Sequence, residues 1–188
     1  MKEKTKKVLI HTCCAICSAH PIKLLQELGY EPIAYFFNPN IYPQSEYSKR
    51  LEAQEKLCKS LNCELIVENY ENDFYNELMT GYENHKEGSE RCERCFEFRL
   101  LKSIQKADEL GIQNFTTSIS ISPHKNFEVL KSVGQKFSKY FNVNFLDFDF
   151  KKQDGFLKTI RMAKELNLYR QNYCGCEVSM QRILKPID

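Results

Sequence analysis

The sequence lacks the features that mark a membrane protein or a secreted protein. Its 188 residues contain no apolar run of the length that a membrane helix needs. The basic residues 1–7 are followed only by Val8, Leu9 and Ile10, which is too short for the apolar section of a signal peptide. We therefore expect a cytoplasmic protein without membrane contact, in which thiols stay reduced.

Glycine-rich phosphate-binding loops are also missing. The pattern G-x-x-x-x-G-K followed by Ser or Thr does not occur, nor does G-x-G-x-x-G. ATP hydrolysis on such a loop is therefore not expected. A net charge of +2 permits a nucleic-acid partner without indicating one. The length and the 42% hydrophobic content suit one globular domain over residues 1–188.

Cysteine, in contrast, is abundant, with nine residues. Seven of them form three tight groups, which are Cys13, Cys14 and Cys17, then Cys92 and Cys95, then Cys174 and Cys176. In a reducing cell, thiols gathered in this way bind a metal or do redox chemistry more often than they form structural disulfides. We expect the two remaining cysteines, Cys58 and Cys63, to fill the core.

Predicted strands and helices alternate along the whole chain. The expected strands span 8–11, 32–37, 64–67, 114–121 and 143–150. The expected helices span 18–28, 45–61, 73–79, 95–110, 127–141 and 155–168, with another from residue 177. Ser18 is the expected cap of the first helix, with Pro21 in its first turn. The alternation predicts an α/β fold with a doubly wound, mostly parallel sheet and flanking helices in a single domain.

The order of these elements predicts where a ligand binds. Open parallel sheets bind ligands beyond the carboxyl ends of the strands, near the point where the strand order reverses. The first cysteine group directly follows the first strand, and residues 118–125 span the end of the fourth. We therefore expect these segments to form the rim of one crevice.

Each cysteine group has a spacing that suits metal or redox chemistry. The first lies at a strand-to-helix turn, where a helix N-terminus stabilises the thiolate form. Cys92 and Cys95 form a C-x-x-C at the start of an amphipathic helix, a spacing that zinc sites, redox dithiols and cluster ligands share. Gly175 lets Cys174 and Cys176 turn to one side, either as an easily reduced disulfide or as two more metal ligands.

The number of thiols favours redox chemistry over a structural zinc site. A structural zinc takes four ligands in total, and the three groups offer seven. A [4Fe–4S] cluster takes four thiols and leaves three for other work. Here such a cluster would use Cys13, Cys14, Cys92 and Cys95, and leave Cys17, Cys174 and Cys176.

Other polar residues give weaker signals. His11 can donate a hydrogen bond to a sulfur, and His20 lies in the first helix turn. His124 and Lys125, after the fourth strand, can supply a proton or contact a phosphate. Glu46 and Arg50 are i, i+4 neighbours on a helix, and we expect them to form a surface salt bridge.

Six segments in order from residue 11 to residue 176 form a specific combination. They are His11 to Ala15 with Cys17, Phe37 to Pro43, Glu46 and Tyr47 with Arg50, Arg91 to Phe96 with Arg99 and Leu100, Phe115 to Thr117 with Ser122, Pro123 and Lys125, and Tyr173 to Cys176. Together they resemble the QueH family of epoxyqueuosine reductases. The resemblance implies a HUP-like (Rossmann-like) domain and the last step of queuosine biosynthesis. In that step the epoxide oxygen of epoxyqueuosine, at the wobble position of tRNA, is removed to give queuosine.

The resemblance also implies roles for the cysteines. Cys13, Cys14, Cys92 and Cys95 would bind a [4Fe–4S] cluster, and Cys174 and Cys176 would form a redox-active disulfide. Some relatives hold a second mononuclear metal, iron, which involves an acidic residue near the first motif, and this chain has Cys17 there. The chemistry suits these groups, because epoxide reduction consumes two electrons, a cluster transfers electrons singly and a cysteine pair stores two.

A tRNA substrate requires further residues and partners. The modified base would be splayed out of the anticodon loop, and protons would come from His124, Tyr173 or water. An electron donor, which the sequence does not identify, is needed as well, and we expect a monomer. The expected phosphate contacts are Arg91, Arg94, Lys125, Arg170 and Arg182.

Two alternatives differ from a reductase in their expected products and metals. One is a zinc-binding RNA-interaction module without catalysis, in which two cysteine pairs close one tetrahedral site. The other is a tRNA sulfur-transfer enzyme that carries sulfur on its thiols. The second alternative expects an ATP-binding glycine loop, which this sequence lacks.

Overall fold

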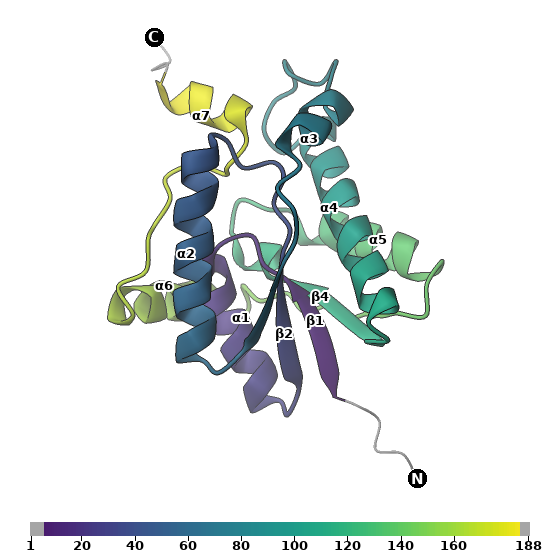
Figure 1. Ribbon diagram of the computed structural model, residues 1–188, viewed down its shortest axis with the longest axis vertical. Coiled ribbons are helices and arrows are strands. Elements are labelled where there is room, and N and C mark those ends of the chain that lie inside the picture. Colours follow the sequence, from purple (N-terminus) through teal and green to yellow (C-terminus); the bar gives the residue numbers. More distant parts are fainter. Residues whose placement is uncertain (1–5, 185–188) are drawn as a thin grey trace.

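Five parallel strands form a central sheet with helices on both faces (Figure 1). The computed structural model describes residues 6–184. Across the sheet the strand order is β3-β2-β1-β4-β5, and all four neighbouring pairs are parallel. The expected α/β, doubly wound fold is therefore confirmed. The strands are β1 (Lys7–His11), β2 (Glu31–Phe36), β3 (Glu64–Val67), β4 (Asn114–Thr117) and β5 (Asn144–Phe145).

The helices form one layer on each face of the sheet and a third group at one end. Helices α1 (Ala15–Glu27), α2 (Gln44–Ser60) and α6 (Gly155–Glu165) lie on one side, and α4 (Glu90–Glu109) and α5 (Phe127–Ser138) on the other (Figure 1). The short helices α3 (Asn72–Leu78) and α7 (Glu177–Leu184) lie beyond the carboxyl ends of the strands. In residues 6–184, no helix has the length and apolar character that crossing a membrane would require.

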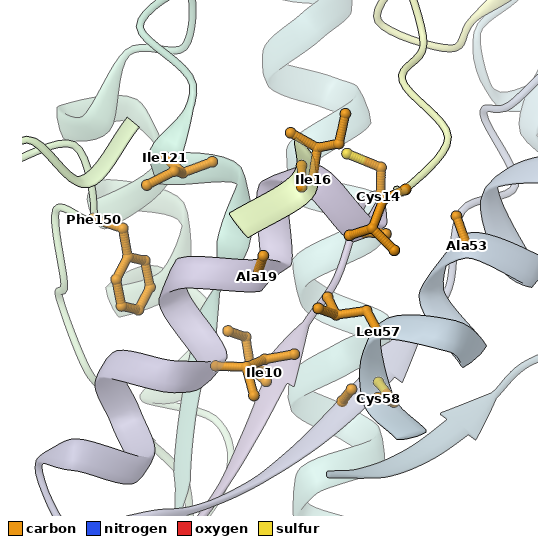
Figure 2. Close-up of a cluster of buried hydrophobic side chains, with 14 of the residues drawn as sticks. Ile10, Cys14, Ile16, Ala19, Ala53, Leu57, Cys58, Ile121 and Phe150 are labelled. Atoms are coloured by element: carbon orange, nitrogen blue, oxygen red, sulfur yellow. The ribbon is translucent and has the colours of Figure 1, made fainter. Parts of the chain in front are cut away.

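The core is divided by the sheet into two clusters, and β1 contributes to both. Val8 and Ile10 belong to the cluster beneath α1 and α2, while Leu9 faces the cluster beneath α4. This alternation follows from the two-residue period of a strand, and it explains the continuous apolar run of a strand covered on both faces. Figure 2 shows the first cluster, in which Ile10, Ala19 and Leu57 lie between the sheet, α1 and α2.

The first helix begins three residues earlier than the sequence predicts. Cys14 is its N-cap, with an extended backbone (φ −170°, ψ 162°) and a sulfur that accepts the Cys17 N–H at 3.3 Å. The prediction of Ser18 as the cap is wrong, because its hydroxyl lies one turn inside the helix and donates to the Cys14 carbonyl at 2.7 Å. Pro21 consequently lies within the helix and not in its first turn. A cysteine cap was missed because Ser, Thr, Asp and Asn are the usual capping residues.

Strands β4 and β5 are shorter than predicted, because side chains take backbone groups that a longer ladder would use. Chain 114–121 leaves the sheet at Thr117 and continues as a 3-10 turn (Ser118–Ile121). Thr116 Oγ1 donates to the Leu146 carbonyl at 2.9 Å, and Ser120 Oγ donates to the Phe148 carbonyl at 2.9 Å. The segment after β5 is therefore held by hydroxyl groups, and the expected strand 143–150 shrinks to two residues. Helix α4 starts at Glu90, five residues before the predicted start at 95.

Packing of α2 on the sheet predicts a large effect at Leu57, which is 0% exposed. We expect Leu57→Ala to lower the free energy of unfolding by about 2–5 kcal/mol, since it leaves a cavity in the core. Leu157→Ala is the matched control, because Leu157 is 52% exposed, and its effect should stay within about 0.5 kcal/mol. Denaturant unfolding followed by circular dichroism measures both, and equal effects would contradict the assigned packing.

Candidate functional site

A cavity of about 990 Å³ opens at the carboxyl ends of β1 and β4, where the strand order reverses. Its walls include the first cysteine group, residues of the segment after β4, and Cys174. The Cys13 N–H donates to Ser118 Oγ at 3.3 Å, which joins the two strand ends directly. The predicted crevice at this edge of the sheet is therefore confirmed.

The first cysteine group is the most compact set of sulfurs in this cavity. The Sγ atoms of Cys13, Cys14 and Cys17 all lie within 4.8 Å of one another, and those of Cys13 and Cys14 are 4.0 Å apart. The backbone places them, since Cys13 follows β1, Cys14 caps α1, and Cys17 lies in its first turn. Thiolates that share one zinc ion lie about 4 Å apart, so three sulfurs this close can reach a single metal ion.

The three thiols share their protons unequally. Hydrogen bonds from the Cys14 and Cys17 thiols hold the pKa of Cys13 well below its usual value. Burial and the bond to Cys13 raise the pKa of Cys14 to about 12, and hydrogen bonding with Cys13 also raises that of Cys17. Cys13 is therefore the thiolate of the group. A metal that takes all three sulfurs must displace the protons of the other two.

The second group lies on the first turns of α4, next to the loop that precedes it. Cys92 Sγ accepts the Gly88 N–H at 3.2 Å, and Gly88 has a φ of +87° that favours glycine. Cys95 lies one turn further along and packs with Tyr75, while Arg99 Nη1 is 3.9 Å from its sulfur. Among the described residues, only the first cysteine group brings three metal-binding side chains within 4.8 Å of one another. The assignment of Cys92 and Cys95 as cluster ligands therefore stays a prediction.

The third group lies on an extended segment, residues 169–176, that crosses the site between α6 and α7; we call it the strap. Cys174 lines the cavity and is exposed to solvent as a residue, while partial desolvation by the cavity walls raises the pKa of its thiol to about 11. Burial alone would raise the pKa of Cys176 as well, but hydrogen bonds with Ser179 and Arg91 lower it. Both cysteines are free thiols. Their role as a redox pair stays a prediction.

Three buried arginines surround the sulfurs. Arg50, Arg91 and Arg99 are 2%, 3% and 3% exposed. Arg91 Nη1 donates to Cys176 Sγ at 2.9 Å, and Arg99 Nη2 donates to Asn38 Oδ1 at 2.7 Å. Within the described part of the chain, Arg91 Nε, Arg91 Nη2 and Arg99 Nε have no hydrogen-bond partner. Since a buried cation is costly unless it is paired, these groups fit a site that holds additional negative charge.

Arg50 fixes the strap in place. Its Nη1 donates to the Cys174 carbonyl at 3.0 Å and its Nη2 to the Tyr173 carbonyl at 3.1 Å. Its Nε donates to Glu46 Oε1 at 2.7 Å, and Tyr169 from the same strap donates to the other oxygen of Glu46 at 2.7 Å. The predicted salt bridge between Glu46 and Arg50 is confirmed, but its expected location on the surface is wrong, because the pair is buried beside the cavity. The signal was ambiguous, since i, i+4 spacing is the same on either face of a helix.

The histidines differ from one another in their surroundings. His11 is fully buried, and its ring nitrogens lie 3.2 Å from Thr117 Oγ1 and 3.1 Å from the Phe37 carbonyl oxygen. Burial and the charge of Arg99 lower the pKa of His11 to about 3, so the ring is neutral. The expected hydrogen bond from His11 to a sulfur is absent from these contacts. His124 lines the cavity, whereas His20 packs against α6.

The five basic residues proposed for phosphate contacts separate into two sets. The first set is Arg91 and Arg94. Arg91 is buried and donates to the Cys176 sulfur. Arg94 donates to the Leu78 carbonyl at 3.1 Å, and its guanidinium group lies over the Tyr82 ring. The prediction is therefore wrong for Arg91, whose guanidinium faces sulfur rather than solvent. The other three line the cavity, and they are Lys125, Arg170 and Arg182.

Some contacts of the site carried no signal in the sequence. Gln171 Nε2 donates to Cys14 Sγ at 2.8 Å, which ties the strap to the first cysteine group. Ser179 Oγ lies 3.4 Å from Cys176 Sγ. Both residues are of common polar types outside any motif, so only the fold identifies them.

The sequence is similar to those of known proteins over nearly its whole length. The family model described as epoxyqueuosine reductase QueH matches residues 8–182. The chain belongs to this family. A relative named epoxyqueuosine reductase QueH from Thermotoga maritima is 35% identical, over 92% of this chain and 90% of the relative. The relative of that name from Streptococcus pyogenes is also 35% identical, over 90% of this chain and 68% of the relative. The resemblance found in the sequence is thus confirmed.

A solved structure supports the fold assignment. The chain superimposes on the U34-tRNA thiolase NcsA from Methanococcus maripaludis, solved with its [4Fe–4S] cluster, with a TM-score of 0.59. The match covers 97% of this chain and 67% of the thiolase at 17% sequence identity. At this identity the likeness concerns the Rossmann-like fold and not the activity.

The contacts of Arg50 predict that it controls access to Cys176. Arg50→Lys keeps the charge beside Glu46 but loses the forked contact with the strap. Each hydrogen bond from a charged donor contributes about 1.5–3 kcal/mol. The loss of one such bond should therefore make conformations in which the strap has detached from Arg50 at least about tenfold more populated. Alkylation of Cys176, followed by mass spectrometry, should accelerate accordingly. Arg161→Lys, an exposed position on α6, is the control, and unchanged labelling in Arg50→Lys would remove this role.

Proposed function

We propose that this protein is an epoxyqueuosine reductase, an oxidoreductase that removes the epoxide oxygen of epoxyqueuosine in tRNA to give queuosine. One observation carries the proposal: the first cysteine group and Cys174, which are far apart in the sequence, line one cavity at the switch point of the sheet, in a chain that belongs to the QueH family. The reaction takes two electrons and two protons, leaves an alkene and releases the epoxide oxygen as water.

The residues around the cavity fit an iron–sulfur centre. We assign Cys13, Cys14, Cys92 and Cys95 as the ligands of a [4Fe–4S] cluster, and Cys17 as a ligand of a second, mononuclear iron. Thiolate sulfur is the donor that such clusters prefer, and the unpartnered guanidinium N–H groups of Arg91 and Arg99 suit its negative charge. When bound, the [4Fe–4S] cluster would supply single electrons, and the mononuclear iron would act as a Lewis acid for the epoxide oxygen.

The unequal thiols of the strap suit a two-electron reductant. Cys176 is stabilised as a thiolate by Arg91, whereas Cys174 keeps its proton and faces the cavity. Oxidation of the two thiols to a disulfide would release two electrons and two protons, which is the amount that the epoxide consumes. An electron donor, yet to be identified, must then reduce the pair again.

Protons and RNA contacts come from the cavity rim. Tyr173 donates its hydroxyl hydrogen to the Tyr42 carbonyl, and burial raises the pKa of Tyr173 to about 12. We therefore favour His124 or water as the proton source. Lys125, Arg170 and Arg182 line the cavity, and we propose that they contact phosphates that flank a splayed anticodon base. We propose that one protein chain, working in the cytoplasm where thiols remain reduced, makes these contacts.

The two alternatives are less well supported. A zinc module would need two cysteine pairs around one ion, whereas the three sulfurs that lie within 4.8 Å of one another all come from the first group, and guanidinium N–H groups of Arg91 and Arg99 lack partners. A sulfur-transfer enzyme would share the fold of the thiolase, but this sequence lacks the glycine loop that ATP-dependent activation uses.

The activity itself gives the first test of this proposal. Protein purified without oxygen and then reduced is incubated with tRNA that contains epoxyqueuosine. We expect nucleoside mass spectrometry to show the loss of one oxygen atom, and metal analysis to show iron and sulfide. Colourless protein that contains zinc and leaves the nucleoside unchanged would favour the RNA-binding module. Sulfur in the product would favour the transferase.

Substitution of single cysteines separates cluster binding from turnover. We expect Cys13→Ala and Cys92→Ala to abolish iron binding and activity together, since each removes a ligand. Cys174→Ala should retain iron but lose activity by about 10³-fold or more, because a group that acts in the reaction is gone. Cys63→Ala, outside the cavity, is the matched control and should keep both. Turnover that survives Cys174→Ala would exclude the dithiol from the reaction.

A further inference from the structure

Two cysteines outside the site meet at the end of helix α2. After the last helical residues, Asn62 takes a φ of +49°, its N–H bonds to the Lys59 carbonyl at 3.4 Å, and the Cys63 N–H bonds to the Cys58 carbonyl at 2.9 Å. This pattern is a Schellman motif, in which the residues at the ends of the longer bond bring their side chains into contact. In α2 those two residues are Cys58 and Cys63.

Other helices of this protein use the same motif with apolar pairs. Leu25 and Tyr30 stand in these positions after α1, and Ala163 and Leu168 stand in them after α6. Helix α4 likewise ends with a bond from Ile112 N–H to the Ala107 carbonyl at 2.8 Å. The motif therefore requires only apolar contact, and two thiols at α2 introduce chemistry that the fold does not need.

The environment of the pair makes the two thiols different. Hydrogen bonds from the Cys63 thiol and from Gln54 Nε2, which is 3.3 Å from Cys58 Sγ, lower the pKa of Cys58 despite its burial. Hydrogen bonding to Cys58 raises the pKa of Cys63, and the Pro32 carbonyl oxygen, 3.2 Å from the Cys63 sulfur, is an alternative acceptor for its single S–H. Such an arrangement has one nucleophilic sulfur and one protonated neighbour, as a redox dithiol requires.

The geometry also permits a covalent bond and access for a small oxidant. Backbones joined by an N···O contact of 2.9 Å leave at most about 7 Å between the two Cα atoms, and disulfides span about 4.4–6.8 Å. Both cysteines line a surface groove of about 570 Å³. The pair is also separate from the cavity site, because Glu46, which contacts the strap, lies twelve residues before Cys58 on the same helix, about 18 Å away.

We propose that Cys58 and Cys63 form a second redox site, a dithiol that hydrogen peroxide oxidises reversibly to an intramolecular disulfide. The Cys58 thiolate attacks one peroxide oxygen, the O–O bond breaks, and the leaving hydroxide takes a proton to become water. The Cys58 sulfenic acid then reacts with the Cys63 thiol, which forms the S–S bond and releases a second water. Two thiols lose two electrons in total, and one peroxide is reduced to two waters.

This site acts independently of the cavity. It uses none of the seven grouped cysteines, and its oxidant enters from a groove lined by different residues. Formation of a disulfide here limits overoxidation of Cys58, because the turn holds the resolving residue, Cys63, next to it through the 2.9 Å backbone bond. A thiol reductant restores the pair by exchange.

Mass mapping of the intact protein tests this inference. Reduced protein is treated with hydrogen peroxide, free thiols are alkylated, and the peptides are compared with those of untreated protein. We expect the peptides of Cys58 and Cys63 to lose both alkyl groups and to appear linked, with the mass of two hydrogens lost. Reduction should restore full alkylation at both positions.

Two variants separate the roles of the sulfurs. Cys63→Ala should leave a Cys58 sulfenic acid that a sulfenic-acid-specific diketone traps, and Cys58→Ala should leave Cys63 alkylatable after peroxide. Thermal unfolding of each variant verifies the fold. If both thiols of the wild-type protein stay alkylatable while cavity cysteines oxidise, or if Cys58 pairs with another cysteine, the inference is wrong. Neither result bears on epoxyqueuosine turnover, which is measured separately in the reduced protein.

Discussion

Buried positive charge is the constraint on which this site depends. Arg50, Arg91 and Arg99 carry three guanidinium groups into a region that is nearly closed to water. A guanidinium stays protonated in a protein, so its charge must be balanced locally. Glu46 balances one of them. The other two face sulfur and amide groups and retain unpaired N–H donors, which is stable only if thiolates or a bound anionic centre stand opposite.

This constraint explains why the sulfurs differ. Hydrogen bonds and nearby cations favour the thiolate: bonds with Ser179 and Arg91 lower the pKa of Cys176, and bonds with Cys14 and Cys17, together with the charge of Arg99, lower the pKa of Cys13. Cys174 points into the cavity and keeps its proton. One residue type therefore provides thiols of unequal acidity, according to the hydrogen bonds and the charge that the fold places beside each. The contacts of Arg50 and Gln171 hold the strap so that Cys174 lines the same cavity as the first cysteine group.

The sequence was sufficient for the architecture, because periodic apolar segments determine it. The alternation of strands and helices predicted the parallel sheet, and strand ends predicted the position of the cavity. Exact boundaries depended on side-chain contacts that no periodicity reveals, such as the cap at Cys14 and the hydroxyl bonds that end β4. Burial of charge was equally hidden. Glu46 and Arg50 show the spacing of a surface pair, and only their packing against the strap shows that they are buried.

The pair at Cys58 and Cys63 shows the same limit from the opposite direction. Their apolar surroundings predicted core filling, and both do pack against the core cluster beneath α2. A residue that fills the core can nonetheless be reactive, because reactivity depends on the hydrogen bonds at the sulfur and not on burial alone. The turn after α2 folds back at Asn62 and brings Cys63 beside Cys58, while Gln54 reaches the Cys58 sulfur from one turn earlier in the helix. Local backbone geometry, rather than sequence spacing, therefore decides which cysteines of this chain act together.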